Sequence, residues 1–389
     1  MSIWDKLVGQ KEVVEELRQY AINRERLANS WLFTGAPGSG RSVAAELFAQ
    51  TLLCEVSGGK GEPCGECEQC RMVEARTHPD VMFVKTNQKQ YKVDDIRSKV
   101  MPIANLTPKI GKYRIIYIED ADRLRQESQN SLLKYFEEPE PLTIWILSCP
   151  NRGDVLPTIQ SRARIVNLKI PSDLDVEMSL KQDGIEQKKA QDVSRLAAGH
   201  IGLAKLWAND EEQLKLRLRN SAIALGVHKT VDAVLFAEEV DKEADRLAEE
   251  KVQAEIKKDE LLLRKELGLG ENDKISKEFQ SFFKSPNKDD LKRMINRSKQ
   301  DYIDIILQEI LMVYRDITLI QSQGKEELVY NQFDLDLIKK YSLALTKKEV
   351  EMRIEKIEEA RKRILTNASL KLILESMFCS LLLPTRVLS

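Results

Sequence analysis

Residues 30–42, SWLFTGAPGSGRS, combine glycines and a hydroxyl at a spacing that can hold phosphate. Gly35 and Gly40 fit the pattern G-x-x-x-x-G-K-[ST], and Ser42 stands where a hydroxyl on the magnesium side is expected. An apolar run precedes the glycines and an alanine-rich helical stretch follows them. Strand, turn and helix start form the context in which backbone N–H groups cradle phosphate. The candidate nucleotide-binding residues are therefore Gly35, Pro37, Gly38, Gly40, Arg41 and Ser42.

Arg41 occupies the position at which this pattern has lysine. A guanidinium is a broad planar fork, whereas lysine carries a compact ammonium on a slim stem, so the exchange is not conservative at a tight site. We predict a P-loop fold with impaired nucleotide chemistry. The alternative is a glycine loop without any ligand.

Four of the six cysteines cluster in the sequence as Cys54, Cys64, Cys67 and Cys70, while Cys149 and Cys379 stand alone. Two C-x-x-C steps with a fourth cysteine upstream supply four thiolates, which is the set that a closed, tetrahedral zinc site takes. In a reducing cytoplasm such a cluster indicates metal rather than disulfides. We predict structural Zn²⁺ in a module at 54–70, with a redox pair as the alternative.

Short apolar runs alternate with helical patterns through the first 171 residues. Stretches of this kind predict a parallel sheet with helices on both faces, in an α/β domain that binds ligands at the carboxyl ends of its strands. Three polar segments fall at such ends: 35–42, Glu119-Asp120 and 148–151. The expected strands after the first are VMFVKT (81–86), RIIYIED (114–120), LTIWILSC (142–149) and RIVNLKI (164–170).

Length and composition predict two or three domains in a helix-rich chain. Of the 389 residues, 32% are charged and 6% aromatic, and the net charge is -1, so any nucleic-acid contact must be local. Neither a membrane-length apolar run nor a secretory segment is present in the sequence, and we expect a cytoplasmic protein. The expected divisions are 1–171, a small helical domain at 172–236, a charged helical arm or linker at 237–274 and a helical domain at 275–389.

Several motifs together resemble the clamp-loader AAA+ ATPases of DNA replication. Residues 130–134 with Glu137-Glu138-Pro139 look like that family's N-A-L-L-K-x-x-E-E-P, and residues 156–163, LPTIQSRA, are similar to its SRC motif. The cysteine insertion after the P-loop helix is shared by bacterial members, and the Gly-Arg-Ser ending resembles an actinobacterial type. The resemblance covers about residues 5–235, and it implies an AAA+ domain, a helical lid and a C-terminal collar domain for oligomerisation.

The departures from that family concern hydrolysis. A working AAA+ site needs a lysine on the phosphates, Asp followed by Glu, a polar sensor and a lid arginine. Here the lysine is Arg41, the acidic pair is reversed to Glu119-Asp120, and Pro150 and Gly202 fall where the resemblance places the two sensors. We therefore expect a degenerate site that does not turn over ATP, although ATP or ADP with Mg²⁺ could be held without turnover.

Arg162 of the SRC-like motif is retained. In the family that arginine projects toward the γ-phosphate of a neighbouring subunit, so the resemblance implies an arginine finger supplied in trans. The alternative is a surface arginine that caps a helix. The implied function is a non-hydrolysing clamp-loader subunit that acts with gamma/tau-type ATPases and a delta-type subunit to place the sliding clamp on primer-template DNA. The rivals are an active gamma/tau-like ATPase subunit and a zinc scaffold outside replication.

Overall fold

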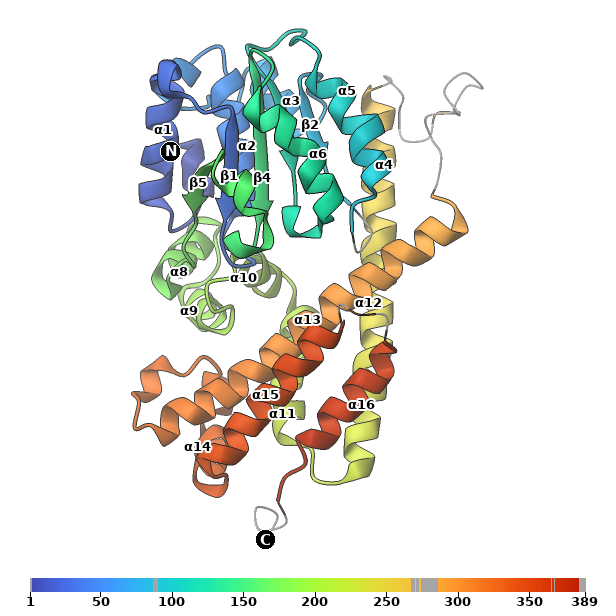
Figure 1. Ribbon diagram of the computed structural model, residues 1–389. Coiled ribbons are helices and arrows are strands. Elements are labelled where there is room, and N and C mark those ends of the chain that lie inside the picture. Colours follow the sequence, from blue (N-terminus) through green and yellow to red (C-terminus); the bar gives the residue numbers. More distant parts are fainter. Residues whose placement is uncertain are drawn as a thin grey trace. The chain divides into compact units, whose positions relative to one another are not determined.

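The computed structural model of the chain describes residues 2–86, 90–266, 270, 273, 286–364, 366 and 368–384 (Figure 1). The chain divides into two compact units, Met1–Asn209 and Asp210–Ser389, and each is described by itself. The last part of the predicted arm or linker, residues 267–274, lies outside the described residues, apart from Gly270 and Asp273.

A five-stranded parallel sheet forms the centre of the first unit, with the strand order β2-β3-β4-β1-β5. The sheet confirms the predicted α/β class. Parallel strands bring their carboxyl ends to one edge, so the segments that follow β1, β3 and β4 meet there. The strands are β1 Ser30–Thr34, β2 Val81–Val84, β3 Arg114–Ile118, β4 Thr143–Cys149 and β5 Arg164–Asn167.

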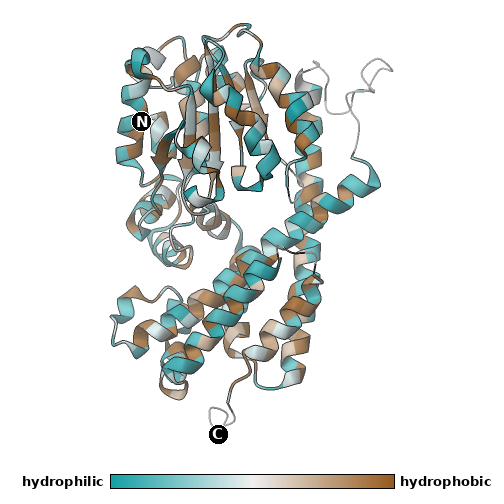
Figure 2. Cartoon of the chain, viewed as in Figure 1, coloured by the Kyte–Doolittle hydropathy of each residue, from teal (hydrophilic) through white to brown (hydrophobic). Residues whose placement is uncertain are grey.

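Helices cover both faces of the sheet because successive strand side chains point to opposite sides. Trp31 and Phe33 pack in one apolar cluster with α1, α2 and α3, whereas Leu32 belongs to a second cluster with α5, α6 and α7. Figure 2 shows apolar residues along the strands and a mixture of apolar and polar residues on the helices around them. The bounds are α1 Lys11–Ile22, α2 Arg41–Leu53, α3 Glu68–Glu74, α4 Val93–Asp95, α5 Met101–Ala104, α6 Gln126–Glu137 and α7 Pro157–Gln160.

The predicted helix at 93–105 is divided. Between α4 and α5 the segment Ile96–Val100 is π-helical, and Pro102 stands in the first turn of α5. Proline has no N–H to donate to the preceding turn, which accounts for the widened turn before it.

Three short helices end the first unit after Pro171. The Ser172 hydroxyl accepts from the Asp175 N–H, and the Asp175 carboxylate accepts from the Ser172 N–H in return, so a capping box begins α8. The bounds are α8 Asp173–Gln182, α9 Gln187–Leu196 and α10 Ile201–Asn209.

The second unit is helical throughout its described residues, and α12 differs from the expected charged arm. α12 runs unbroken across the expected boundary at residues 236 and 237, and Ala237, Val240 and Ala244 are buried in the apolar cluster of this unit. Small apolar residues every three or four positions give the charged helix one buried side. Residues 210–236 therefore lie with the C-terminal helices. The bounds are α11 Glu211–Leu225, α12 Thr230–Glu266, α13 Lys288–Gln321, α14 Leu335–Ala344, α15 Lys347–Ile364 and α16 Leu370–Ser380.

A buried carboxyl lies among the helices of the second unit. Glu309 on α13 accepts a hydrogen bond from Asn220 Nδ2 at 2.8 Å, and its other oxygen is 3.7 Å from Arg217 Nε. Burial raises the pKa of Glu309 to about 7 despite the nearby guanidinium.

Within the described chain no helix is long and apolar enough to cross a membrane.

We expect Glu309→Gln to stabilise the second unit above pH 7 and to leave it unchanged near pH 4. The unfolded chain ionises this carboxyl near its ordinary value, whereas the folded chain holds the proton to about pH 7. Folding therefore becomes less favourable as the pH rises from the ordinary glutamate pKa toward 7, and a neutral amide removes a penalty of roughly 3 kcal/mol. Thermal unfolding at pH 4 and pH 8 measures the effect, with the exposed Glu359→Gln on α15 as control. A loss of stability at pH 8 would contradict the expectation.

Candidate nucleotide site and four-cysteine cluster

The glycine loop curls against His200, which comes from the segment after Pro171. Gly38 has φ +83°, and a Cβ there would lie 2.3 Å from the ring of His200. Gly40 has φ +93° and precedes α2, which begins without a side-chain cap. The first N–H groups of α2 are then available to an anion, and the helix dipole favours one there.

The guanidinium of Arg41 lies near Asp120, which follows β3. Its Nη2 is 3.9 Å from Asp120 Oδ1, while Arg123 Nε is 3.5 Å from Asp120 Oδ2. Arg41 Nη1 is buried and has no hydrogen-bond partner within the described chain. An orphaned guanidinium nitrogen beside a helix N-terminus fits a phosphate ligand, since Arg binds phosphate through paired N–H groups. Asp120 also has φ +47°, a left-handed conformation that Asp tolerates better than most residues.

Glu119 is paired with an arginine that sequence reasoning missed. Arg76 Nη2 lies 3.7 Å from Glu119 Oε1 and 3.9 Å from Glu46 Oε2, and its guanidinium stacks over the ring of Phe83. In the sequence, Arg76 is distinguished only by its position six residues after Cys70, just past the end of α3, and this position does not predict a contact with Glu119. Glu119 therefore faces a cation of its own chain.

Ser42 and Ser148 are linked by a buried tyrosine. Tyr117 on β3 donates its hydroxyl to Ser42 Oγ at 3.3 Å and lies 3.0 Å from Ser148 Oγ. Burial raises the pKa of Tyr117, so the phenol stays protonated. Pro150, the predicted position of the first sensor, follows β4 directly and has no side-chain donor.

His200 covers the glycine loop from the helices after Pro171. A Cβ on Gly202, the predicted position of the lid sensor, would lie 3.3 Å from His200 Cε1, so the imidazole stands beside both Gly38 and Gly202. Burial lowers the pKa of His200, which favours the neutral ring at neutral pH. An uncharged ring from the segment after Pro171 thus contacts the glycine loop, and the sequence motifs did not predict this contact.

Arg162 lies on the surface rather than in the core. Its Nη2 is 2.7 Å from Glu137 Oε1, and its Nη1 donates to Thr158 O at 2.9 Å and to Ser161 Oγ at 3.3 Å. Its side chain is 36% exposed.

The four clustered cysteines come together as predicted. Their sulfur atoms all lie within 4.8 Å of one another, with Cys64 Sγ to Cys70 Sγ at 3.9 Å and Cys67 Sγ to Cys54 Sγ at 4.0 Å. Four thiolates at about 2.3 Å from zinc stand roughly 3.8 Å apart, so this set could hold a metal such as zinc. Burial opposes ionisation of Cys54, yet the N–H groups of Ser57 and Cys64 lower its pKa to about 6.

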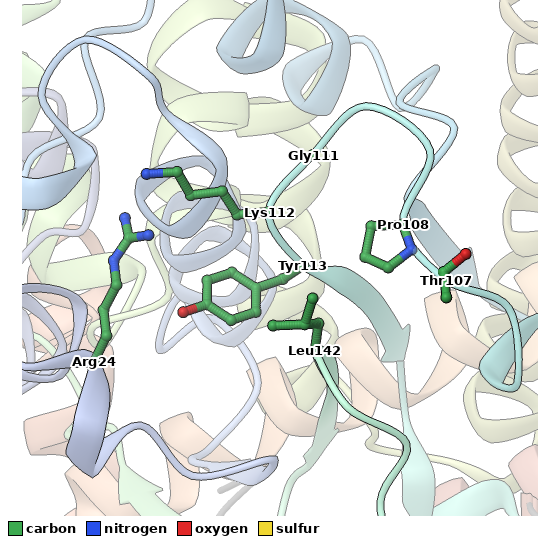
Figure 3. Close-up of a pocket in the computed structure, with 7 residues that line it drawn as sticks. All are labelled: Arg24, Thr107, Pro108, Gly111, Lys112, Tyr113 and Leu142. Carbon is green, nitrogen blue, oxygen red and sulfur yellow. The ribbon is translucent and has the colours of Figure 1, made fainter.

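Two further features lie apart from these sites. His78 contacts Gln69 and accepts from the Asp80 N–H, so its ring is engaged outside the cysteine cluster. A cavity of about 500 Å³ opens where β3 and β4 begin, at the sheet edge opposite the glycine loop (Figure 3). It is lined by Arg24, Thr107, Pro108, Gly111, Lys112, Tyr113 and Leu142.

Comparison with known proteins agrees with this architecture. Residues 9–172 match the family described as DNA polymerase III, delta subunit. The chain is 26% identical over 374 residues to DNA polymerase III subunit delta' of Bacillus subtilis, covering 96% of this chain and 97% of that one. It is 33% identical to subunit delta' of Haemophilus influenzae, over 35% of this chain and 41% of that one. Subunit tau/gamma of Haemophilus influenzae is 28% identical over 59% of this chain and 32% of its own.

A parallel sheet with a glycine loop after β1 and an acidic pair after β3 is the arrangement of a P-loop α/β domain, here with a four-cysteine cluster, and the matched relatives are clamp-loader subunits of DNA polymerase III. Within that class, the chain is similar to the delta-prime subunits of DNA polymerase III. The likeness to an actinobacterial type stays a prediction.

Proposed function

We propose that this chain is a non-hydrolysing subunit of the replicative clamp loader, and that it lends Arg162 in trans to a neighbouring ATPase subunit. The observation that carries the proposal is the contrast between the residues at the chain's own glycine loop and Arg162. At its own glycine loop, the side chains of Arg41 and Glu119 are 13% and 15% exposed and face charges of the same chain. Arg162 is also paired, with Glu137, but it stands on the surface with a side chain that is 36% exposed.

The own-site geometry supports loss of turnover. Hydrolysis needs a carboxylate that is available to orient water and a cation that reaches the phosphates. Here Glu119 is paired with Arg76, and the lid offers the neutral His200 beside Gly38. Gly35, Pro37, Gly38, Gly40, Arg41 and Ser42 would still hold the phosphates of ATP or ADP, with Mg²⁺ on the Ser42 side. A bound nucleotide would supply the anion that Arg41 Nη1, which is buried and without a hydrogen-bond partner in the described chain, can bind.

The partners follow from the family. We propose that the chain assembles with gamma/tau and delta subunits through its AAA+ and collar regions, in the cytoplasm. Together they would place the sliding clamp on primer-template DNA. The four cysteines would hold one structural Zn²⁺, because a closed thiolate set leaves no position for a reacting water. As domains we propose the AAA+ domain at 1–171, the lid after it and a C-terminal collar that includes the long α12.

Phosphate release by the purified chain tests the first half of the proposal. We expect no steady release from ATP with Mg²⁺, with or without primed DNA, because Glu119 is paired with Arg76 and Asp120 with Arg41 and Arg123. A malachite-green assay measures this, with a gamma/tau subunit as positive control. Release that magnesium and DNA stimulate would favour the rival function, an active gamma/tau-like ATPase. Substitution of Arg162 in the assembled complex tests the second half.

A further inference from the structure

The guanidinium of Arg162 is held against its own chain. Nη2 contacts Glu137 Oε1 at 2.7 Å, and Nη1 donates to Thr158 O at 2.9 Å and to Ser161 Oγ at 3.3 Å. A group that must reach the phosphate of a neighbour is therefore occupied at both terminal nitrogens. The contact to Glu137 differs from the other two because it brings a full negative charge.

The ion pair joins two elements that are fixed to each other. Glu137 is the last residue of α6, and Arg162 lies two residues beyond the end of α7. On α6 the buried Gln129 accepts a hydrogen bond at 2.8 Å from the N–H of Leu156, the N-cap residue immediately before α7. Ile159 in α7 is fully buried in the apolar cluster that also contains Leu132 and Phe136 of α6. The carboxylate is thus placed beside the arginine by packing and not by a free loop.

The charges of the Arg162–Glu137 pair favour replacement of the Glu137 carboxylate by a phosphate. A carboxylate beside the guanidinium cancels part of its charge and repels an approaching γ-phosphate. The side chains of Arg162 and Glu137 are 36% and 49% exposed, so water screens their attraction. An exposed pair of this kind is weak enough for a multiply charged phosphate to displace the carboxylate, because Arg binds phosphate through paired N–H groups.

We propose that Glu137 is a latch, a positioning residue that holds Arg162 against its own chain until the γ-phosphate of a neighbouring subunit's nucleotide takes the place of the carboxylate. The inference rests on the proposed function. It adds that the arginine becomes available only when the neighbour is loaded with triphosphate. An empty or diphosphate-bound neighbour leaves the latch closed.

Glu137→Gln in the reconstituted clamp loader tests the latch. The amide keeps the shape of the side chain and removes its charge. We expect the ATP concentration for half-maximal hydrolysis to fall about two- to fivefold, which is the range that an exposed ion pair converts to, with little change in the maximal rate. The difference in this ATP concentration between Glu137→Gln and the wild type should shrink at high salt. Glu138→Gln is the matched control, since it removes the same charge one residue further along the chain.

The outcomes separate the latch from the proposed function. If Arg162→Ala leaves hydrolysis by the complex unchanged, the proposed function fails and the latch fails with it. If Arg162→Ala lowers hydrolysis while Glu137→Gln has no effect, only the latch is overturned. It is also overturned if Glu137→Gln lowers the maximal rate as Arg162→Ala does, since Glu137 would then orient the arginine for reaction.

A measurement without turnover completes the test. In the purified chain, ¹⁵N resonances of the Arg162 guanidinium report its ion pair. We expect Glu137→Gln to shift them and to speed rotation about the Cζ–N bonds, while Glu138→Gln leaves them in place. Both residues are exposed, so the variants should fold, and circular dichroism checks that. Unshifted resonances in Glu137→Gln would show that the pair does not form in solution and would overturn the proposal.

Discussion

Arg162→Ala is expected to reduce hydrolysis at the neighbouring ATPase site by about 10³-fold or more, because an arginine finger stabilises the charge that develops on the transferred phosphoryl group. The chain itself should fold normally, since Arg162 is exposed and its ion pair with Glu137 is of the weak surface kind. Single-turnover hydrolysis in the reconstituted complex measures the effect. In steady state, ATP hydrolysis by the whole complex should fall by the fraction that takes place at the ATPase site next to Arg162.

Two further variants make that result specific. Arg162→Lys keeps the charge and loses the planar fork, so we expect an intermediate rate. Arg164→Ala serves as the matched control, because Arg164 lies two residues away and forms a similar surface pair with Glu16 at 2.8 Å. An assembled complex that hydrolyses ATP at the wild-type rate with Arg162→Ala would remove the basis for the trans role.

Cys70→Ser has the second large expected effect, on the four-cysteine cluster and the zinc that we propose it holds. Cys70 is fully buried in α3, and its carbonyl accepts a hydrogen bond from Gln50 of α2 at 3.3 Å. Loss of one thiolate from a closed set removes metal affinity, and metal binding is part of the folding free energy of such a module. We expect bound zinc to be lost on dialysis and amide hydrogen exchange to rise at least tenfold through residues 54–75. Zinc analysis and exchange mass spectrometry measure both.

The same substitution should reach the nucleotide site through α3. This helix begins after Cys67 and leads to Arg76, which pairs with Glu119 and Glu46. When α3 loosens, Glu119 loses its cation, and hydrogen exchange around the end of β3 should rise as well. Cys379→Ser is the control, because Cys379 lies in α16 of the other unit. Retention of zinc by Cys70→Ser would contradict the four-thiolate site.

Much of the fold could be predicted because its signals are local. The apolar runs that became β1 to β5 are short and bounded by polar residues or turn residues, and both period and length point to buried parallel strands. Cysteine spacing likewise predicted a cluster that the sulfur positions confirm. The charged pattern at 237–267 was less informative, since Ala237, Val240 and Ala244 have too little apolar surface to stand out among the charges around them.

The sequence by itself determined the glycine loop, the reversed acidic pair, the cysteine set and the position of Arg162, because each depends on residue type and spacing within a short segment. Only the tertiary structure decided what those residues face: His200 over Gly38, Arg76 against Glu119, and Glu137 against Arg162. Each of these contacts joins segments that are 25 or more residues apart. Which segments meet is set by packing of the whole domain, and no local pattern encodes it.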